Sequence, residues 1–226
     1  MAVFRSLAFY IAFYLGTFYY VIASLIAVTF SRDAFRANVH GWSRWHRRCV
    51  TGLLGIEVKV EGAPLDEPVL YAVKHESFFE AIDTTTLFRL PAVFAKQELF
   101  DIPGWGRTAA IYGLIPVERE AGARALRAMI KQARDRVSEG RPLVIFPEGT
   151  RVAGGIAPPL RAGFAGLYKL VGLPVVPVAV DSARTYRHLV KKRGTITYKF
   201  GEPIPPGLPR DEVEARVHEA INTLNR

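Results

Sequence analysis

Residues 69–80 read Val-Leu-Tyr-Ala-Val-Lys-His-Glu-Ser-Phe-Phe-Glu, an apolar run that passes into polar residues and then into a second apolar pair. The apolar part, residues 69–73, is typical of a short buried strand. Ser77, with Glu80 three positions later, is the pattern of a helix start in which the two side chains cap backbone amides reciprocally. A strand followed at once by a helix places His75 at the carboxyl end of that strand, where open α/β sheets bind their ligands.

Apolar or alternating runs typical of strands recur after residue 55, and segments with a helical pattern separate most of them. The predicted strands are residues 56–60, 69–73, 92–95, 114–117, 143–146, 175–180 and 195–200. The predicted helices are residues 77–88, a segment ending near 112, and residues 121–139, 163–170 and 211–225. This alternation predicts an α/β fold with a mostly parallel mixed sheet flanked by helices. Pro177 favours an edge or a bulge for its strand, because proline has no N–H for a neighbouring strand.

The N-terminus predicts a membrane-associated helical segment. Residues 6–31 contain no charged residue, and a helix needs about 20 apolar residues to cross a bilayer. Length favours spanning slightly over embedding in one leaflet; a buried core helix is the remaining alternative. Residues 35–54 carry Trp42, Trp45 and four arginines, which is typical of an amphipathic helix on a headgroup surface. We therefore divide the chain into membrane-anchoring helices, residues 1–54, and an α/β domain, residues 55–226.

Charge sets the expected partners and the orientation. The formal charge of the 226-residue chain is +9, which favours anionic partners such as lipid headgroups, nucleic acid or phosphorylated substrates. Arginines are more frequent after the apolar segment than before it, which predicts a cytoplasmic location for the domain that follows. Cys49 is the single cysteine, which excludes an internal disulfide and a cysteine-based zinc cluster.

His75 is a candidate general base, and a carboxylate would have to orient its ring. Glu80 is five positions away, about 140° around a helix, so the two meet only if His75 lies in the loop and Glu80 in the first helical turn. Glu80 is alternatively a helix cap alone, or fills both roles, and Asp83 is a second candidate for the orienting acid. A zinc helix would need histidine where Phe79 stands, so we expect no metal. Ser77 lacks the Gly-x-Ser-x-Gly context of a hydrolytic nucleophile.

Residues 146–151, Phe-Pro-Glu-Gly-Thr-Arg, form the second candidate site. A predicted strand ends there, proline and glycine favour a turn, and Arg151 follows. A guanidinium can hold a phosphate through two parallel hydrogen bonds. Arg119, at the end of another predicted strand, could bind the same phosphate. A plain turn with a solvated arginine is the alternative.

Together these residues resemble the 1-acylglycerol-3-phosphate acyltransferase family. The family's His-x-x-x-x-Asp motif corresponds to His75–Glu80, with glutamate in place of aspartate. Its second motif resembles residues 113–119, its Phe-Pro-Glu-Gly-Thr-Arg motif is intact at 146–151, and its Val-Pro-Val strand is residues 176–178. Lys96 opens a Lys-Gln-Glu-Leu stretch that also matches. The resemblance covers about residues 55–205.

The resemblance implies direct transfer of a fatty acyl group from a thioester, either acyl-CoA or an acyl carrier protein, with no resident cofactor. The expected acceptor is a lysophospholipid, above all 1-acyl-sn-glycerol-3-phosphate, and the expected partners are membrane lipids rather than nucleic acid. Another lysolipid acceptor, or a non-catalytic lipid-binding protein, is the alternative. The implied catalytic residues are His75 and Glu80. The implied substrate-binding residues are Arg119, Glu148, Gly149, Thr150, Arg151 and Lys96.

Overall fold

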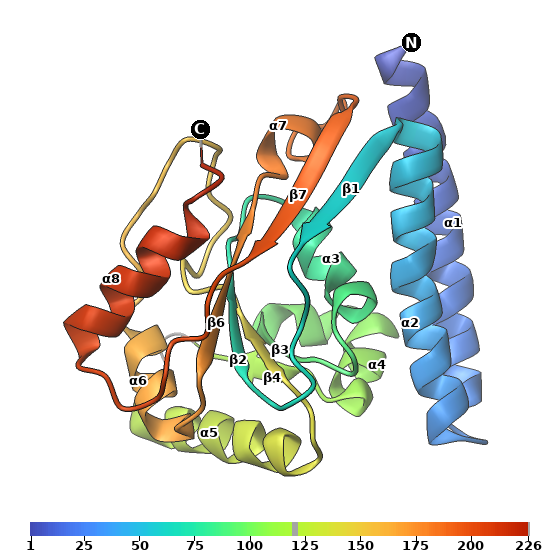
Figure 1. Cartoon of the computed structure of the whole chain (residues 1–226). Coiled ribbons are helices and arrows are strands. Elements are labelled where there is room, and N and C mark those ends of the chain that lie inside the picture. The colour runs from blue at the N-terminus through green and yellow to red at the C-terminus, as the bar shows by residue number, and fades with distance from the viewer. Residues whose placement is uncertain (119–121, 226) are drawn as a thin grey trace.

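The apolar run forms β2 (Leu70–Val73), the central strand of a seven-stranded sheet in the computed structural model (Figure 1). The structure describes residues 1–118 and 122–225. The other strands are β1 (Ile56–Glu61), β3 (Ala92–Lys96), β4 (Ile115–Val117), β5 (Leu143–Ile145), β6 (Val175–Val180) and β7 (Gly194–Phe200). Their order is β1-β7-β6-β2-β5-β3-β4, and the pairs are parallel except for β6 with β7. The predicted α/β fold with a mostly parallel mixed sheet is confirmed.

Helices cover both faces of the sheet (Figure 1). They are α1 (Ala2–Ala27), α2 (Arg32–Cys49), α3 (Phe78–Leu87), α4 (Trp105–Tyr112), α5 (Gly122–Ser138), α6 (Gly163–Val171), α7 (Ala183–Tyr186) and α8 (Arg210–Ile221). A π-helical turn, η1 (Val50–Leu54), follows α2, and a 3₁₀ segment, η2 (Gln97–Asp101), follows β3. The last helix ends earlier than the predicted residue 225.

The central strand is apolar throughout because both of its faces are covered. Leu70 and Ala72 pack with residues of α5, α6 and α8 on one side. Tyr71 and Val73 pack with residues of α1, η1 and α3 on the other. A strand that is buried on both faces is stabilised by a continuous run of apolar residues rather than by alternating apolar and polar residues.

Helices α1 and α2 form a hairpin along one side of the sheet (Figure 1). The indole of Trp45 donates to the carbonyl of Ala12 at 3.2 Å, and that of Trp42 donates to the Thr17 hydroxyl at 2.9 Å. Gly16 permits this approach, since a Cβ there would collide with the Trp45 indole. The two helices are therefore joined along the middle of α1.

The hairpin also shares its core with the sheet. Phe9 and Phe13 of α1 are buried in the same apolar cluster as Val73 and Phe79. The boundary predicted between residues 54 and 55 coincides with the change from helix to sheet, but the core continues across it.

Pro177 departs from the prediction, because β6 lies inside the sheet between β7 and β2. Its register partner on β2 is Ala72. The Pro177 ring instead faces Gly201, which lies just beyond the end of β7. The N–H of Gly201 donates to the Pro177 carbonyl at 2.8 Å. Proline is tolerated in this interior strand because β7 ends where the missing N–H would be needed.

Candidate active site

His75 lies in the loop between β2 and α3, and Glu80 lies in the first turn of α3, as the sequence predicts. The Nδ1 of His75 is 3.0 Å from Oε1 of Glu80. The same oxygen accepts the backbone N–H groups of Glu76 and Ser77, each at 2.6 Å, and Ser77 caps the helix in return. Glu80 therefore makes both the contact with the ring and the capping contact.

The surroundings of Glu80 favour its ionised form. Burial by itself raises the pKa of this carboxyl, but the hydrogen bonds from His75, the Ser77 amide and the Ser182 hydroxyl outweigh burial and hold the pKa below its ordinary value. Ser182, which follows β6, donates to Oε2 at 2.7 Å. Because an ionised carboxylate only accepts, Nδ1 of His75 carries the hydrogen and Nε2 carries the lone pair. This tautomer can accept a proton from a substrate hydroxyl.

The loop that contains residues 146–151 holds His75 from its other side. The His75 ring stacks on Phe146 with 4.2 Å between ring centroids, and the His75 side chain remains 16% exposed. The backbone N–H of His75 donates to Oε2 of Glu148 at 2.9 Å, and the His75 carbonyl accepts from Val152 N–H at 2.7 Å. The two predicted sites are therefore one site.

Glu148 is anchored by a buried lysine. The Nζ of Lys74 lies 2.7 Å from Oε1 of Glu148, and neither side chain is exposed. Lys74 also donates to Oδ1 of Asn222, at the end of α8, and to the carbonyl of Ile156. Both oxygens of Glu148 thus have partners inside the protein. The structure gives Glu148 a positioning role in place of the predicted contact with substrate, because its carboxylate is turned away from solvent.

Thr150 and Arg151, the last two residues of the 146–151 motif in this loop, are exposed. The Arg151 guanidinium lies 3.8 Å from the centroid of the Phe78 ring, a distance at which a cation is attracted to an aromatic face. Gly149 has φ of +65°, a conformation that favours glycine, and it lets the turn bring Arg151 out toward solvent. An imidazole with an ionised partner next to an exposed arginine can deprotonate a hydroxyl on a molecule that also carries an anionic group.

Comparison with known proteins identifies the family. Residues 13–181, three quarters of the chain, match the family model described as Acyltransferase. The chain belongs to the acyltransferase family. It is an enzyme, and the resemblance predicted from its four motifs is confirmed.

Named relatives agree with this assignment. The acyltransferase is 28% identical to a 1-acyl-sn-glycerol-3-phosphate acyltransferase of Pseudomonas aeruginosa, over 98% of this chain and 86% of that protein. It is 27% identical to one of Chlamydomonas reinhardtii, over 70% of this chain and only 48% of the algal protein. Its fold matches the crystal structure of the acyltransferase PlsC from Thermotoga maritima, with a TM-score of 0.79 and 23% identity, over 99% and 98% of the two chains.

Two residues named from the sequence are not brought to His75. Asp83 of the acyltransferase is bound instead by Arg47 Nε at 2.8 Å and by the Tyr198 hydroxyl at 3.0 Å, so it does not orient the histidine. Lys96 is exposed at the end of β3, two strands away from β2 across the sheet. Arg119 lies outside the described residues.

Sequence reasoning missed Lys74 and Ser182. Both signals were present in the acyltransferase sequence. Lys74 continues the buried positions of a strand, and a charge there requires a partner. Ser182 follows a predicted strand at its carboxyl end, the edge at which ligand sites gather.

Glu76 supplies a test of the electrostatics beside His75. Burial, the largest effect, raises the pKa of this carboxyl to about 7, although the hydrogen bond donated by the backbone N–H of Ala183 lowers it. Because the folded pKa lies above the unfolded one, the protonated form stabilises the fold at low pH, and this stability is lost between about pH 4.5 and 7. Glu76→Gln, which keeps an acceptor for Ala183, should therefore raise the melting temperature at pH 8 and change it little at pH 5. Thermal unfolding at both pH values measures this.

We expect the gain at pH 8 to be at least about 2 °C, the shift that 1 kcal/mol produces in a chain of this size. Glu219→Gln, an exposed change on α8, is the control and should show no pH-dependent difference. Equal effects of Glu76→Gln at the two pH values would contradict the argument.

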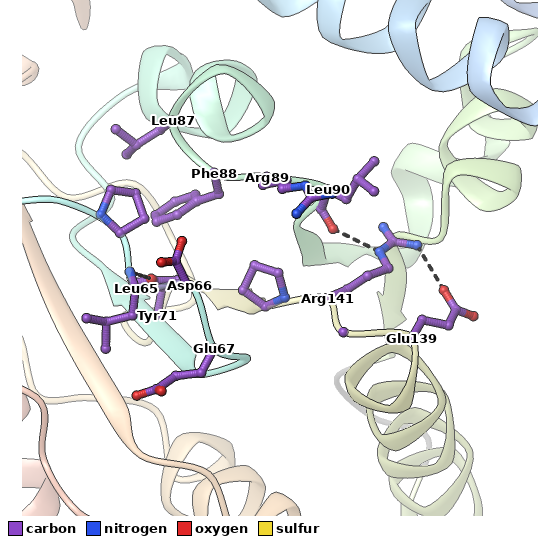
Figure 2. Close-up of a pocket in the computed structure, with 13 residues that line it drawn as sticks. Leu65, Asp66, Glu67, Tyr71, Leu87, Phe88, Arg89, Leu90, Glu139 and Arg141 are labelled. Atoms are coloured by element: carbon purple, nitrogen blue, oxygen red, sulfur yellow. Dashed lines mark hydrogen bonds and ion pairs between the residues drawn. The ribbon is translucent and has the colours of Figure 1, made fainter.

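A hollow, drawn in Figure 2, lies at the amino ends of the central strands, opposite to the edge that carries His75. Its volume is about 660 Å³, and it is lined by the loops that precede β2, β3 and β5. Arg141 at its rim donates to the carbonyls of Leu90, Tyr112 and Pro91 and is therefore used within the protein. We place the chemistry of the acyltransferase at the His75 edge, where the reactive groups gather.

Proposed function

We propose that this acyltransferase moves a fatty acyl group from an acyl thioester to the free hydroxyl of 1-acyl-sn-glycerol-3-phosphate, forming phosphatidic acid. The observation that carries the proposal is the pair of His75 and Glu80, held against the loop that presents Arg151. The names of the relatives support the same acceptor. We propose acyl-CoA or an acyl carrier protein as the donor.

The chemistry follows from the tautomer of the histidine. Nε2 of His75 takes the proton of the acceptor hydroxyl while the oxygen attacks the thioester carbonyl, and Glu80 stabilises the imidazolium that forms. The tetrahedral intermediate collapses with cleavage of the C–S bond, and the imidazolium returns its proton to the leaving thiolate. One C–O bond forms, one C–S bond breaks, and no covalent enzyme intermediate is required.

Arg151 would bind the phosphate of the acceptor, with the Thr150 hydroxyl and the Gly149 backbone beside it. Lys96 and Arg119 remain predicted substrate contacts. Arginine suits this task because its planar donors match the geometry of a phosphate. The carboxylate of Glu148 does not contact the acceptor in this proposal; it holds the loop that presents Arg151 against His75.

Purified enzyme, labelled acyl-CoA and a panel of lysolipids test the proposal, with acyl carrier protein as a second donor. We expect the highest kcat/KM with 1-acyl-sn-glycerol-3-phosphate, and product identified as phosphatidic acid. A higher kcat/KM with a lysolipid of another headgroup would replace the proposed acceptor. Lipid binding without any acyl transfer would contradict the proposed reaction.

We also propose that the hairpin of α1 and α2 lies in one leaflet of a membrane, with the catalytic domain on the cytoplasmic side. Helix α1 is long and apolar enough to span, and length alone slightly favoured spanning. However, α2 is bound along the middle of α1 and carries Arg36, Arg44 and Arg48, which are costly at the centre of a bilayer. The large exposed side chains of α1, such as Leu7, Leu15 and Phe18, would insert into the leaflet, and the helix itself would not cross the membrane.

Deleting residues 1–30 would remove Phe9 and Phe13 from the core, so substitution is the better test. Leu7→Glu, Leu15→Glu and Phe18→Glu together should shift the enzyme from the membrane to the soluble fraction without lowering its melting temperature. Leu126→Glu, Ile156→Glu and Leu170→Glu, exposed apolar residues outside α1, form the control.

Protease protection separates the two membrane arrangements. If α1 lies in one leaflet, a tag at Met1 is cleaved from the same side as the catalytic domain in inverted vesicles. Protection of that tag would instead show a spanning helix.

A further inference from the structure

A hollow of about 360 Å³ is lined by Thr150, Arg151 and Arg187. Arg187 directly follows α7, and so reaches this hollow from a segment that lies after β6 in the chain. The hollow is within the range of volumes that small-molecule sites occupy, and is large enough for a phosphate together with its glycerol. Two guanidinium groups thus face one space from segments that are distant in sequence.

Both arginines contact residues that follow His75 closely in the chain. Arg151 lies over the ring of Phe78, and Nη1 of Arg187 donates to the carbonyl of Glu76 at 3.0 Å. A guanidinium has five N–H donors, and this bond occupies one of those on Arg187. Within residues 1–118 and 122–225, no aspartate or glutamate forms an ion pair with either arginine. Two cations held close together without an acid favour an anionic ligand between them.

We propose that Arg187 is a second phosphate-binding residue, which grips the phosphomonoester of the acceptor together with Arg151. This inference rests on the proposed function and adds a residue to its acceptor site. A phosphomonoester carries nearly two negative charges at neutral pH, so two guanidinium groups match its charge as well as its oxygens.

The chain that follows Arg187 lies on α1, which suits a lipid acceptor. Two residues further on, the carbonyl of Leu189 accepts from the Tyr10 hydroxyl at 2.8 Å, and Lys191 N–H donates to the Ser6 hydroxyl at 2.9 Å. The segment after α7 is therefore docked on the N-terminal half of α1, and Figure 1 shows α7 and that end of α1 on the same side of the molecule. A lysophospholipid could keep its acyl chain beside the membrane helix while its phosphate enters the hollow.

Arg187→Gln tests the proposal, because glutamine keeps an N–H for the Glu76 carbonyl and loses the charge. With 1-acyl-sn-glycerol-3-phosphate as acceptor, we expect KM to rise at least tenfold and kcat to stay within about twofold. The inhibition constant of inorganic phosphate, used as a competitor, should rise in parallel. Arg151→Gln is the positive comparator, and Lys192→Gln, an exposed cation outside the hollow, is the charge-matched control that should change neither constant.

The outcomes separate the inference from the proposed function. An Arg187→Gln enzyme with normal constants, beside an Arg151→Gln enzyme with a raised KM, would overturn the role of Arg187 and leave the proposed acceptor standing. A fall in kcat alone would also overturn it, since that pattern means a structural effect through Glu76. Normal constants in both variants would overturn the phosphate-bearing acceptor itself.

Discussion

His75→Ala is expected to lower kcat for acyl transfer by about 10²–10⁴-fold, the usual contribution of a general base. The ring is partly exposed and its removal leaves Glu80 bound by the amides of Glu76 and Ser77, so the melting temperature should change little. Steady-state kinetics with saturating acyl-CoA and acceptor measure the effect. His188→Ala, an exposed histidine that does not line the hollow, is the control and should retain activity. Turnover close to that of the unmodified enzyme would remove His75 from the mechanism.

Glu80→Gln separates the two contacts of this carboxylate. Glutamine can still accept the backbone N–H groups that cap α3, but it carries no charge to stabilise an imidazolium. We therefore expect kcat to fall at least about tenfold while the melting temperature stays near normal. Full activity in this variant would mean that Glu80 serves only as a helix cap.

Lys74→Met is expected to lower the free energy of unfolding by about 3–5 kcal/mol, because it leaves the Glu148 carboxylate buried without its partner. The Ile156 carbonyl and Asn222 lose a donor at the same time. At about 2–4 °C per kcal/mol, the melting temperature should fall by about 6–20 °C. Thermal or denaturant unfolding measures the loss, and Lys169→Met, on the exposed side of α6, should change stability very little.

A second variant tests the cause of that loss. Adding Glu148→Gln to Lys74→Met removes the isolated charge and keeps an acceptor for the His75 amide, so part of the stability should return. A double variant less stable than Lys74→Met would show that the lysine acts chiefly through Asn222 and Ile156.

The local structure of this chain could be predicted from the sequence because short-range physics determines it. Apolar runs marked β2 and its neighbours, and Ser77 with Glu80 marked the start of α3 through contacts within four residues. The same reasoning placed His75 in a loop at a strand end. The loop of residues 146–151 meets His75 because β5 and β2 are parallel neighbours, and the carboxyl ends of parallel strands share an edge of the sheet.

Tertiary structure alone decided which distant partner each buried charged group has. Glu148 was predicted to contact substrate, yet its buried carboxylate is bound by Lys74 and by the backbone N–H of His75. Asp83 is bound by Arg47. Arg187 lines the same hollow as Arg151, although no local pattern distinguished the segment that contains it. Sequence periodicity reports which face of an element is apolar. It does not report which distant side chain meets a buried charge, because that choice is made by the long-range packing of whole helices against the sheet.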